Sequence, residues 1–441
     1  MATILGANTL SSGYSIDNSC RFFSNTKMVR TNASTSTNRT QGCFSTWIKK
    51  CNPSGTGGGI ITGYVDANNF SVIYFDGDHR LCFLEYVSGS AAHFLRAPNL
   101  FRDPSAWMHI AYLIDTTQGT AANRIKLYIN GTQITSFHSG GTTQPDQNDT
   151  LLIFTQNSSL DLGQDTSGSP HMLNAYLADT LLVDGATVAI DDLGEFDEDS
   201  PKIWKPKDIS AISVGTNGFR LDYQDSANLG NAADGGTDLT ETNLAATDQA
   251  TDTPTNNFCT LNPLENYHAG GTFAEGNTYY TSVSSKHDFA VSTIAMTSGK
   301  WYAEFKIHQD TDYNIVGITD HGYQGSNQEL SEDNYSYGFA NYDASKSIVR
   351  GNGSTTIDNM PLFGDGDIIG VAVDITNSKL YFSKNGTFIN SGDPTSGSTG
   401  TGAQSIQDLS SGSGTSYGQD VYFFGIGLWN TSAAGNYSAN F

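Results

Sequence analysis

The sequence predicts an all-β protein of two antiparallel, jelly-roll-like β-sandwich domains joined by a polar linker. Apolar and polar residues alternate in runs that recur about every ten residues, the pattern of strands that bury one face. The 441 residues include 47 glycines, and only 15% are charged, which is typical of short strands joined by turns. Hydrophobic residues make up 37% of the chain, enough to fill two cores.

The N-terminal half contains a series of closely spaced strand patterns. They cover residues 44–48, 59–64, 70–75, 81–86, 107–114, 124–134, 176–183 and 218–223. Asn130-Gly131 interrupts one of these runs, and this dipeptide favours a type I′ turn because both of its central residues need positive φ. We therefore expect a β-hairpin at Asn130.

The C-terminal half repeats the pattern at 299–307, 314–319, 335–342, 367–374, 379–389 and 421–429. In the first of these runs, Trp301, Ala303, Phe305 and Ile307 should face one side. Asn385-Gly386 predicts a second hairpin. The near-continuous apolar run 421–429 predicts a central strand covered on both faces, and the Gly/Ser/Thr-rich stretch 391–418 predicts a long loop.

The domain boundaries follow from a change in composition. Residues 228–256 contain no aromatic residue and almost no large apolar one, which indicates a linker. The expected domains are therefore 1–227 and 257–441. Residues 126–132 and 379–387 share a strand–turn pattern, which fits either two versions of one architecture or the general likeness of β-hairpins.

Charge and cysteine content exclude several classes of protein. The formal net charge of −23 argues against a nucleic-acid partner, because phosphate binding needs clustered Lys and Arg. The apolar runs are strand-sized, so no membrane span is expected, and the start of the chain lacks the basic and apolar regions of a secretory signal. No C-x-x-C pair is present, so we expect free thiols made in a reducing cytoplasm at Cys20, Cys43, Cys51, Cys82 and Cys259.

Segments of the sequence resemble two known protein families. Residues 101–112, 124–131 and 176–185 resemble the laminin-G, or concanavalin A-like, lectin fold. Four segments resemble a SPRY domain: 299–305, 337–340, 366–374 and 380–386. The resemblance implies a bent β-sandwich that serves as a binding module.

Three further segments, 194–207, 215–223 and 253–263, resemble virion proteins of marine bacteriophages. Those proteins join laminin-G-like and SPRY-like modules in tail fibres or other surface appendages. Such relatives usually continue beyond the position of Phe441, so the resemblance leaves the true C-terminus open.

The sharpest catalytic candidate is the acidic run Glu195, Asp197 and Asp199. Concanavalin A-like sandwiches include family 16 glycoside hydrolases, whose catalytic strand carries Glu-x-Asp-x-Glu. Here the third side chain is one methylene shorter, and the run has the composition of a loop. We therefore expect a solvated acidic loop, no catalytic residues and no enzyme activity.

No cofactor-binding residue is predicted, and the metal ligands are unknown. Asp76 with Asp78, and Asp161 with Asp165, supply hard oxygen ligands, but calcium needs six to eight of them. Turn formation already explains the Asp-Gly pattern, so calcium stays unassigned.

Two histidines lie in patterns that bear on ligand contact. His109 lies between Met108 and Ile110 in a strand pattern, which favours a satisfied core or edge residue. His321, close to Tyr323 in a polar stretch, could touch a ligand, although a solvated loop is the default.

Together these features predict a non-enzymatic phage virion structural protein, a tail fibre or surface appendage component. It would be made in the host cytoplasm, be exposed on the particle, and bind other virion proteins and a host-surface glycan or protein. The alternatives are a polysaccharide depolymerase and a secreted lectin or adhesin. No heptad or collagen period is present, and the expectation of a homo-trimer rests on the resemblance to fibre proteins alone.

Overall fold

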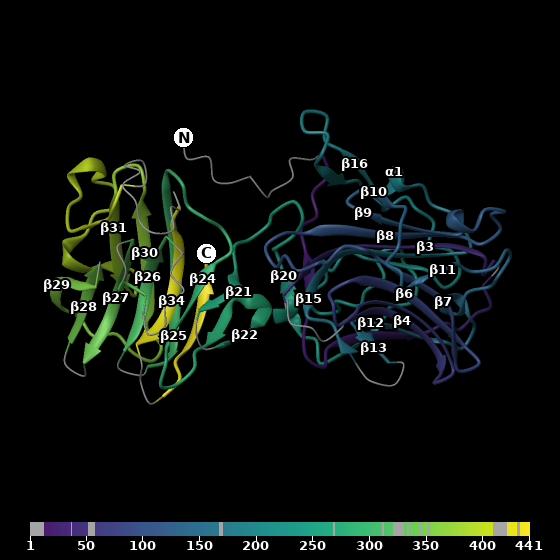
Figure 1. Ribbon diagram of the computed structural model, residues 1–441, viewed down its shortest axis with the longest axis horizontal. Coiled ribbons are helices and arrows are strands. Elements are labelled where there is room, and N and C mark those ends of the chain that lie inside the picture. The colour runs from purple at the N-terminus through teal and green to yellow at the C-terminus, as the bar shows by residue number, and fades with distance from the viewer. Residues whose placement is uncertain are drawn as a thin grey trace. The chain divides into compact units, whose positions relative to one another are not determined.

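The computed structural model describes residues 13–36, 38–51, 58–166, 171–267, 270–310, 313–320, 330–332, 335–343, 346–351, 353–408, 421–429 and 433–441. The described residues up to Phe258 form one compact unit, the N-terminal sandwich, and those from Cys259 form a second, the C-terminal sandwich (Figure 1). Within these residues the only α-helix is the single turn α1 (Ile190–Leu193). The predicted all-β fold with antiparallel sheets is confirmed.

The N-terminal sandwich contains two large antiparallel sheets. The first sheet has the order β10 (Thr132–Ile134), β9 (Ile125–Ile129), β8 (Met108–Asp115), β3 (Gln41–Lys50), β15 (Ala175–Asp184), β1 (Ser19–Phe22) and β20 (Gln249–Ala250), with β18 (Phe219–Leu221) also paired to β15. The second sheet has the order β11 (Thr142–Thr143), β7 (Ser90–Arg96), β6 (Leu81–Val87), β5 (Asn69–Phe75), β4 (Gly58–Asp66), β12 (Ser159–Leu162), β2 (Lys27–Thr31) and β19 (Thr240–Thr242). Two small hairpins add β13 (Gln164–Asp165) with β14 (His171–Met172), and β16 (Gly194–Phe196) with β17 (Trp204–Pro206).

Alternation along the strands decides which side chains fill the core. Tyr112 and Ile114 of β8 join Phe44 of β3, and Phe75 and Phe83 of the second sheet, in one buried cluster. The intervening residues of the first sheet point to its outer side. There a second apolar cluster covers the sheet with residues from the segment after β15; its members include Cys43, Ala111, Leu181, Val183, Leu193, Ile209 and Val214.

The segment 228–256, predicted as a linker, is instead part of the N-terminal sandwich. It supplies β19, which pairs with β2, and β20, which pairs with β1. Of its three leucines, Leu229 and Leu239 are buried in the main core, and Leu244 is partly buried against it. The linker prediction was wrong because these edge strands are held by backbone hydrogen bonds, which need no large side chains.

The C-terminal sandwich also contains two antiparallel sheets. One has the order β21 (Leu261–Tyr267), β24 (His287–Ser292), β34 (Phe423–Trp429), β26 (Asn314–Thr319), β27 (Ser336–Asp343), β28 (Lys346–Gly351) and β29 (Ser354–Met360). The other has the order β22 (Thr272–Ala274), β23 (Tyr279–Thr281), β35 (Asn436–Asn440), β25 (Lys300–Gln309), β30 (Ile368–Asp374), β31 (Lys379–Lys384) and β32 (Thr387–Phe388), with β33 (Gln404–Ser405) also paired to β31.

The strand predictions for this sandwich agree with the structure. Ala303, Phe305 and Ile307 of β25 are buried in one core, and Trp301 packs against it. Strand β34 is central, lying between β24 and β26. Of the predicted loop 391–418, the described part ends at residue 408 and includes the short strand β33.

Both predicted Asn-Gly hairpins form, and they are built in the same way. The backbone N–H of His109 donates to Asn130 Oδ1 over 2.7 Å, and that of Ile368 donates to Asn385 Oδ1 over 2.8 Å. In return, the backbone N–H of each asparagine donates to the carbonyl of the same strand residue, at 2.9 and 2.8 Å. The likeness between the two segments therefore extends from sequence to hydrogen bonding.

Candidate functional site

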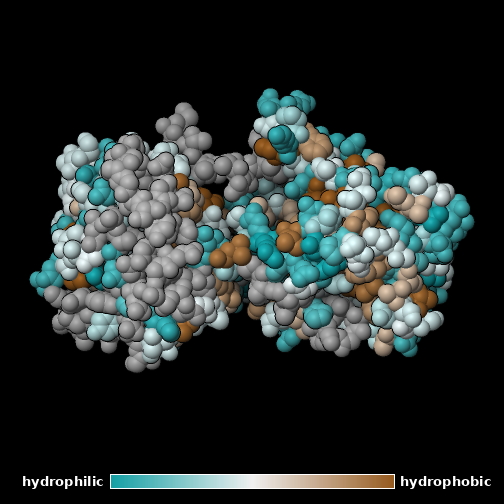
Figure 2. Space-filling model, viewed as in Figure 1, coloured by the Kyte–Doolittle hydropathy of each residue, from teal (hydrophilic) through white to brown (hydrophobic). Residues whose placement is uncertain are grey.

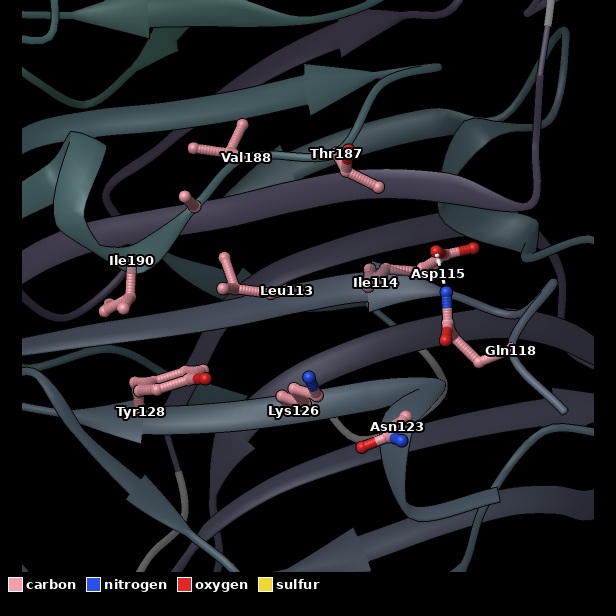
Figure 3. A pocket seen from close by; sticks show the side chains of 11 residues that line it. Leu113, Ile114, Asp115, Gln118, Asn123, Lys126, Tyr128, Thr187, Val188 and Ile190 are labelled. Atoms are coloured by element: carbon pink, nitrogen blue, oxygen red, sulfur yellow. Dashed lines mark hydrogen bonds between the residues drawn. The ribbon is translucent and has the colours of Figure 1, made fainter. Parts of the chain in front are cut away.

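A pocket of about 420 Å³ lies on the outer side of the first sheet of the N-terminal sandwich (Figure 3). Strands β8 and β9 line it together with residues 187–190, which precede and begin α1. Its volume lies in the range of about 300–1,000 Å³ that small-molecule pockets occupy. The site is therefore large enough for a small ligand.

The alternation that builds the core also builds this pocket. Tyr112 points inward, so Leu113 and Asp115 of β8 point outward; on β9, Leu127 points inward while Lys126 and Tyr128 point outward. The strand register places Leu113 opposite Lys126. Two neighbouring strands thus present their outward side chains to one site.

The segment after β15 completes the pocket. It turns at Gly185, whose φ of 96° lies in the region that favours glycine. Val188 and Ile190 then pack against the outer apolar cluster, as Leu113 and Tyr128 do. In Figure 3 these four side chains lie toward one end of the pocket, which is therefore mainly apolar.

The other end of the pocket is polar. Asp115 accepts hydrogen bonds from Gln118 Nε2 at 2.6 Å, from Thr117 Oγ1 at 2.5 Å and from Gln41 Nε2 at 3.3 Å. Partial burial alone would raise the pKa of Asp115, but these bonds outweigh it and lower the pKa. Asp115 is therefore an ionised carboxylate whose oxygens already have partners.

Between the two ends lie Lys126 and Tyr128. The Tyr128 hydroxyl donates to Gln133 Oε1 over 3.3 Å. Partial burial, and then the charge of Asp191, raise the pKa of Tyr128, so its hydroxyl stays neutral. Lys126 has no ion-pair partner within the part of the chain that the structure describes.

The predicted acidic run lies elsewhere, on the β16–β17 hairpin. Glu195 is in β16, not in a loop, and its side chain is 47% exposed. Its carboxylate faces Lys205 Nζ at 3.7 Å and Lys207 Nζ at 3.4 Å. Two ammonium groups therefore lie near this carboxylate, and one of them, that of Lys205, also lies near Asp197.

Asp197 closes the turn of this hairpin. It accepts the backbone N–H groups of Ser200 at 2.8 Å and Asp199 at 3.0 Å. The bond from Ser200, followed by that from Lys205, lowers the pKa of Asp197. The general acid of a glycosidase needs a raised pKa. The lowered pKa of Asp197 is instead that of a carboxylate that accepts hydrogen bonds in a turn.

The combined change Glu195→Gln and Asp197→Asn should leave the protein folded and active in binding. Gln and Asn keep the size of each side chain, and an Asn oxygen can still accept the two turn N–H groups. We expect the free energy of unfolding to change by less than about 0.5 kcal/mol, as measured by urea denaturation. Shortening of a polysaccharide by the wild type that this variant abolishes would contradict the absence of catalysis at these residues.

The carboxylates considered for calcium have protein partners. Asp76 Oδ2 lies 2.5 Å from Arg96 Nε, and Asp78 Oδ2 lies 2.6 Å from Arg96 Nη2. Asp161 faces Lys27 Nζ at 3.6 Å, and nothing is described of the Asp165 side chain. Among the described residues no group of three or more His, Cys, Asp or Glu side chains is placed to hold a metal. Calcium ligands therefore stay unassigned.

His109 is a satisfied core residue, as its sequence context predicted. Its Nδ1 accepts from the indole N–H of Trp204 at 3.2 Å, so its Nε2 carries the proton and bonds Ser45 Oγ at 2.8 Å. Burial lowers the pKa of His109 to about 3, which keeps the ring neutral. His321 and Tyr323 lie outside the described residues.

The pocket residues on β8 and β9 were not predicted from the sequence. The available signal was the alternation itself, because Lys126 and Tyr128 fall on the face of their strand opposite to Leu127. What the pattern could not show is that residues 187–190 return to this face. Figure 2 shows hydrophobic residues in small groups among hydrophilic ones on the visible face of the N-terminal sandwich.

The fold defines a protein of two β-sandwich modules, and comparison with known families agrees with this architecture. Residues 23–184 match the laminin G model described as the concanavalin A-like lectin/glucanases superfamily. Residues 300–393 match the SPRY domain model. The chain thus carries a laminin-G-like module followed by a SPRY module, as the resemblances implied.

Solved structures with similar folds are distant. Domains LG4-5 of the mouse laminin alpha1 chain share 12% identity, covering 97% of this chain and 84% of theirs, with a TM-score of 0.33. The SPRY domain of human HERC1 shares 13% identity over 41% of this chain and 96% of its own, with a TM-score of 0.30. A putative carbohydrate binding protein from Bacteroides ovatus shares 13% identity over 52% of this chain and 59% of its own, with a TM-score of 0.36.

No curated protein matches the sequence significantly. Of the helices in the described residues, none has the length and apolar character needed to cross a membrane.

Proposed function

We propose that the chain is a non-catalytic binding protein whose N-terminal sandwich holds a saccharide in the pocket formed by β8, β9 and residues 187–190. The observation that carries the proposal is the division of the pocket into an apolar end, with the Tyr128 ring, and a polar end. A sugar ring has the same division, since its C–H faces are apolar and its hydroxyl edge forms hydrogen bonds. The match of residues 23–184 to a superfamily that includes lectins supports this proposal.

The wider role that we propose is attachment of a phage particle to its host, as a tail fibre or surface appendage component of the virion. Segments 194–207, 215–223 and 253–263, which resemble virion proteins, support it. The SPRY module would then bind another virion protein or a second feature of the host surface. Copies held together, for instance as a trimer, would turn weak single contacts into strong attachment.

Replacing Tyr128 with alanine tests the saccharide site. We expect at least a tenfold loss of affinity for the best ligand of a glycan array, because stacked aromatic contacts contribute about 1–3 kcal/mol to binding. The matched control is Tyr302→Ala, since Tyr302 is 47% exposed on β25 of the other sandwich. Equal affinities for the two variants would show that the pocket is not the site.

The appendage role is tested on purified particles. Mass spectrometry should find the chain in the virion, and labelling with a specific antibody should place it on a tail fibre or another surface structure. Light scattering on the isolated chain, compared with its copy number per particle, gives the oligomeric state. A chain that is absent from particles would contradict the virion assignment and leave the saccharide proposal standing.

A further inference from the structure

We infer that the pocket selects saccharides that carry a negative charge, and that Lys126 binds their carboxylate. The inference rests on the proposed function, because it names the class of sugar for the same pocket. It follows from the charges that line the pocket and from the partners that each charge already has.

Lys126 is the available cation of this site. It projects from the outer face of β9, opposite Leu113 and two residues before Tyr128. Figure 3 shows its amine between the apolar end and the polar end of the pocket. Its lack of an ion pair within the described residues contrasts with Lys205, whose Nζ lies near two carboxylates.

The carboxylates around the pocket form no ion pair with Lys126 among the described contacts. Asp115 is occupied by Gln41, Thr117 and Gln118, and no ion pair within 4.0 Å joins it to Lys126 among the described contacts. Asp191 acts on Tyr128 through its charge. The pocket is thus lined by one cation, Lys126, and one carboxylate, Asp115, which are not joined by an ion pair.

This arrangement suits one ligand orientation. The carboxylate of the ligand would meet Lys126, the ring would lie against Tyr128 and Leu113, and hydroxyl groups would reach Asn123 and Gln118. The formal net charge of the chain is −23, so the protein as a whole repels anions. A preference for acidic sugars must therefore come from this local contact.

The test compares matched uronic-acid and neutral oligosaccharides, with calorimetry on the full chain. We expect the acidic sugar to bind about ten- to a hundredfold more tightly, the effect of one charge-assisted hydrogen bond. Lys126→Met should remove this difference, and Lys126→Arg should keep most of it. The control Lys306→Met removes an exposed charge from β25 in the other sandwich and should change neither affinity.

The outcomes separate this inference from the proposed function. Equal binding of acidic and neutral sugars, lost in Tyr128→Ala, would overturn the charge selection and leave the saccharide site in place. A preference for acidic sugars that Lys126→Met does not reduce would also overturn it. Failure of every sugar to bind would overturn both. A sulfated sugar that binds as tightly as the uronic acid would support recognition of negative charge. Thermal unfolding of each variant checks that the variant is folded.

Discussion

Replacing Lys49 with methionine should destabilise the N-terminal sandwich by about 3–5 kcal/mol, the usual cost of breaking a buried ion pair from one side. The Lys49 side chain is only 1% exposed. Its Nζ donates to Asp252 Oδ2, Asn257 Oδ1 and the carbonyl of Phe258, each at 2.8 Å. One ammonium group therefore fixes the last residues of this sandwich onto β3.

The cost arises because the variant leaves the Asp252 carboxylate buried without its cation. The indole N–H of Trp107 still donates to Asp252 Oδ1 over 2.8 Å, but a neutral donor does not replace a charge. Urea denaturation followed by tryptophan fluorescence measures the effect. The control is Lys207→Met, because Lys207 is 39% exposed and its partner Glu195, at 3.4 Å, is 47% exposed, so its loss should cost less than about 1 kcal/mol. Equal losses in the two variants would contradict this account of Lys49.

Replacing Gly131 with alanine should destabilise the N-terminal sandwich by about 2–5 kcal/mol. The φ of Gly131 is 71°, where an L-residue costs about 1–2 kcal/mol. A Cβ at this position would also overlap the ring of Trp204, which is 4% exposed, and overpacking adds about 1–3 kcal/mol. The tryptophan ring lies so close to the hairpin that only glycine fits.

Gly386→Ala is the matched comparison for this change. Gly386 occupies the same place in the second Asn-Gly hairpin, with φ of 78°, but a Cβ there meets nothing within 4 Å. Only the backbone cost of about 1–2 kcal/mol should remain. Thermal and urea unfolding of both variants gives the difference; an equal loss at the two sites would show that contact with Trp204 is not important.

Local patterns were the part of the structure that the sequence could predict. The turns at Asn130 and Asn385 depend on two adjacent residues, and the buried face of β25 depends on strict alternation around Phe305, so both were predictable. The short strand β16 was missed because the acidic composition around Glu195 is typical of loops.

Features that depend on distant pairing could not be predicted from a local pattern. Strands β19 and β20 add backbone to existing sheet edges, and their polar side chains hide this role. The pocket needs Val188 and Ile190 to return to β8 and β9. Nothing near Lys126 in the sequence shows that this segment will lie there.

The pairing of β1 with β20 has a consequence for folding during synthesis. It joins Ser19 to Ala250, which are 231 positions apart. At about 5–20 residues per second, the ribosome needs roughly 10–50 seconds to make the chain between these two strands. For that interval one edge of β1 lacks its partner strand, and an unpaired edge can pair with another nascent chain. Contacts this distant in sequence also slow folding, so the N-terminal sandwich should complete its fold late, and the yield of native protein should depend on keeping nascent chains apart.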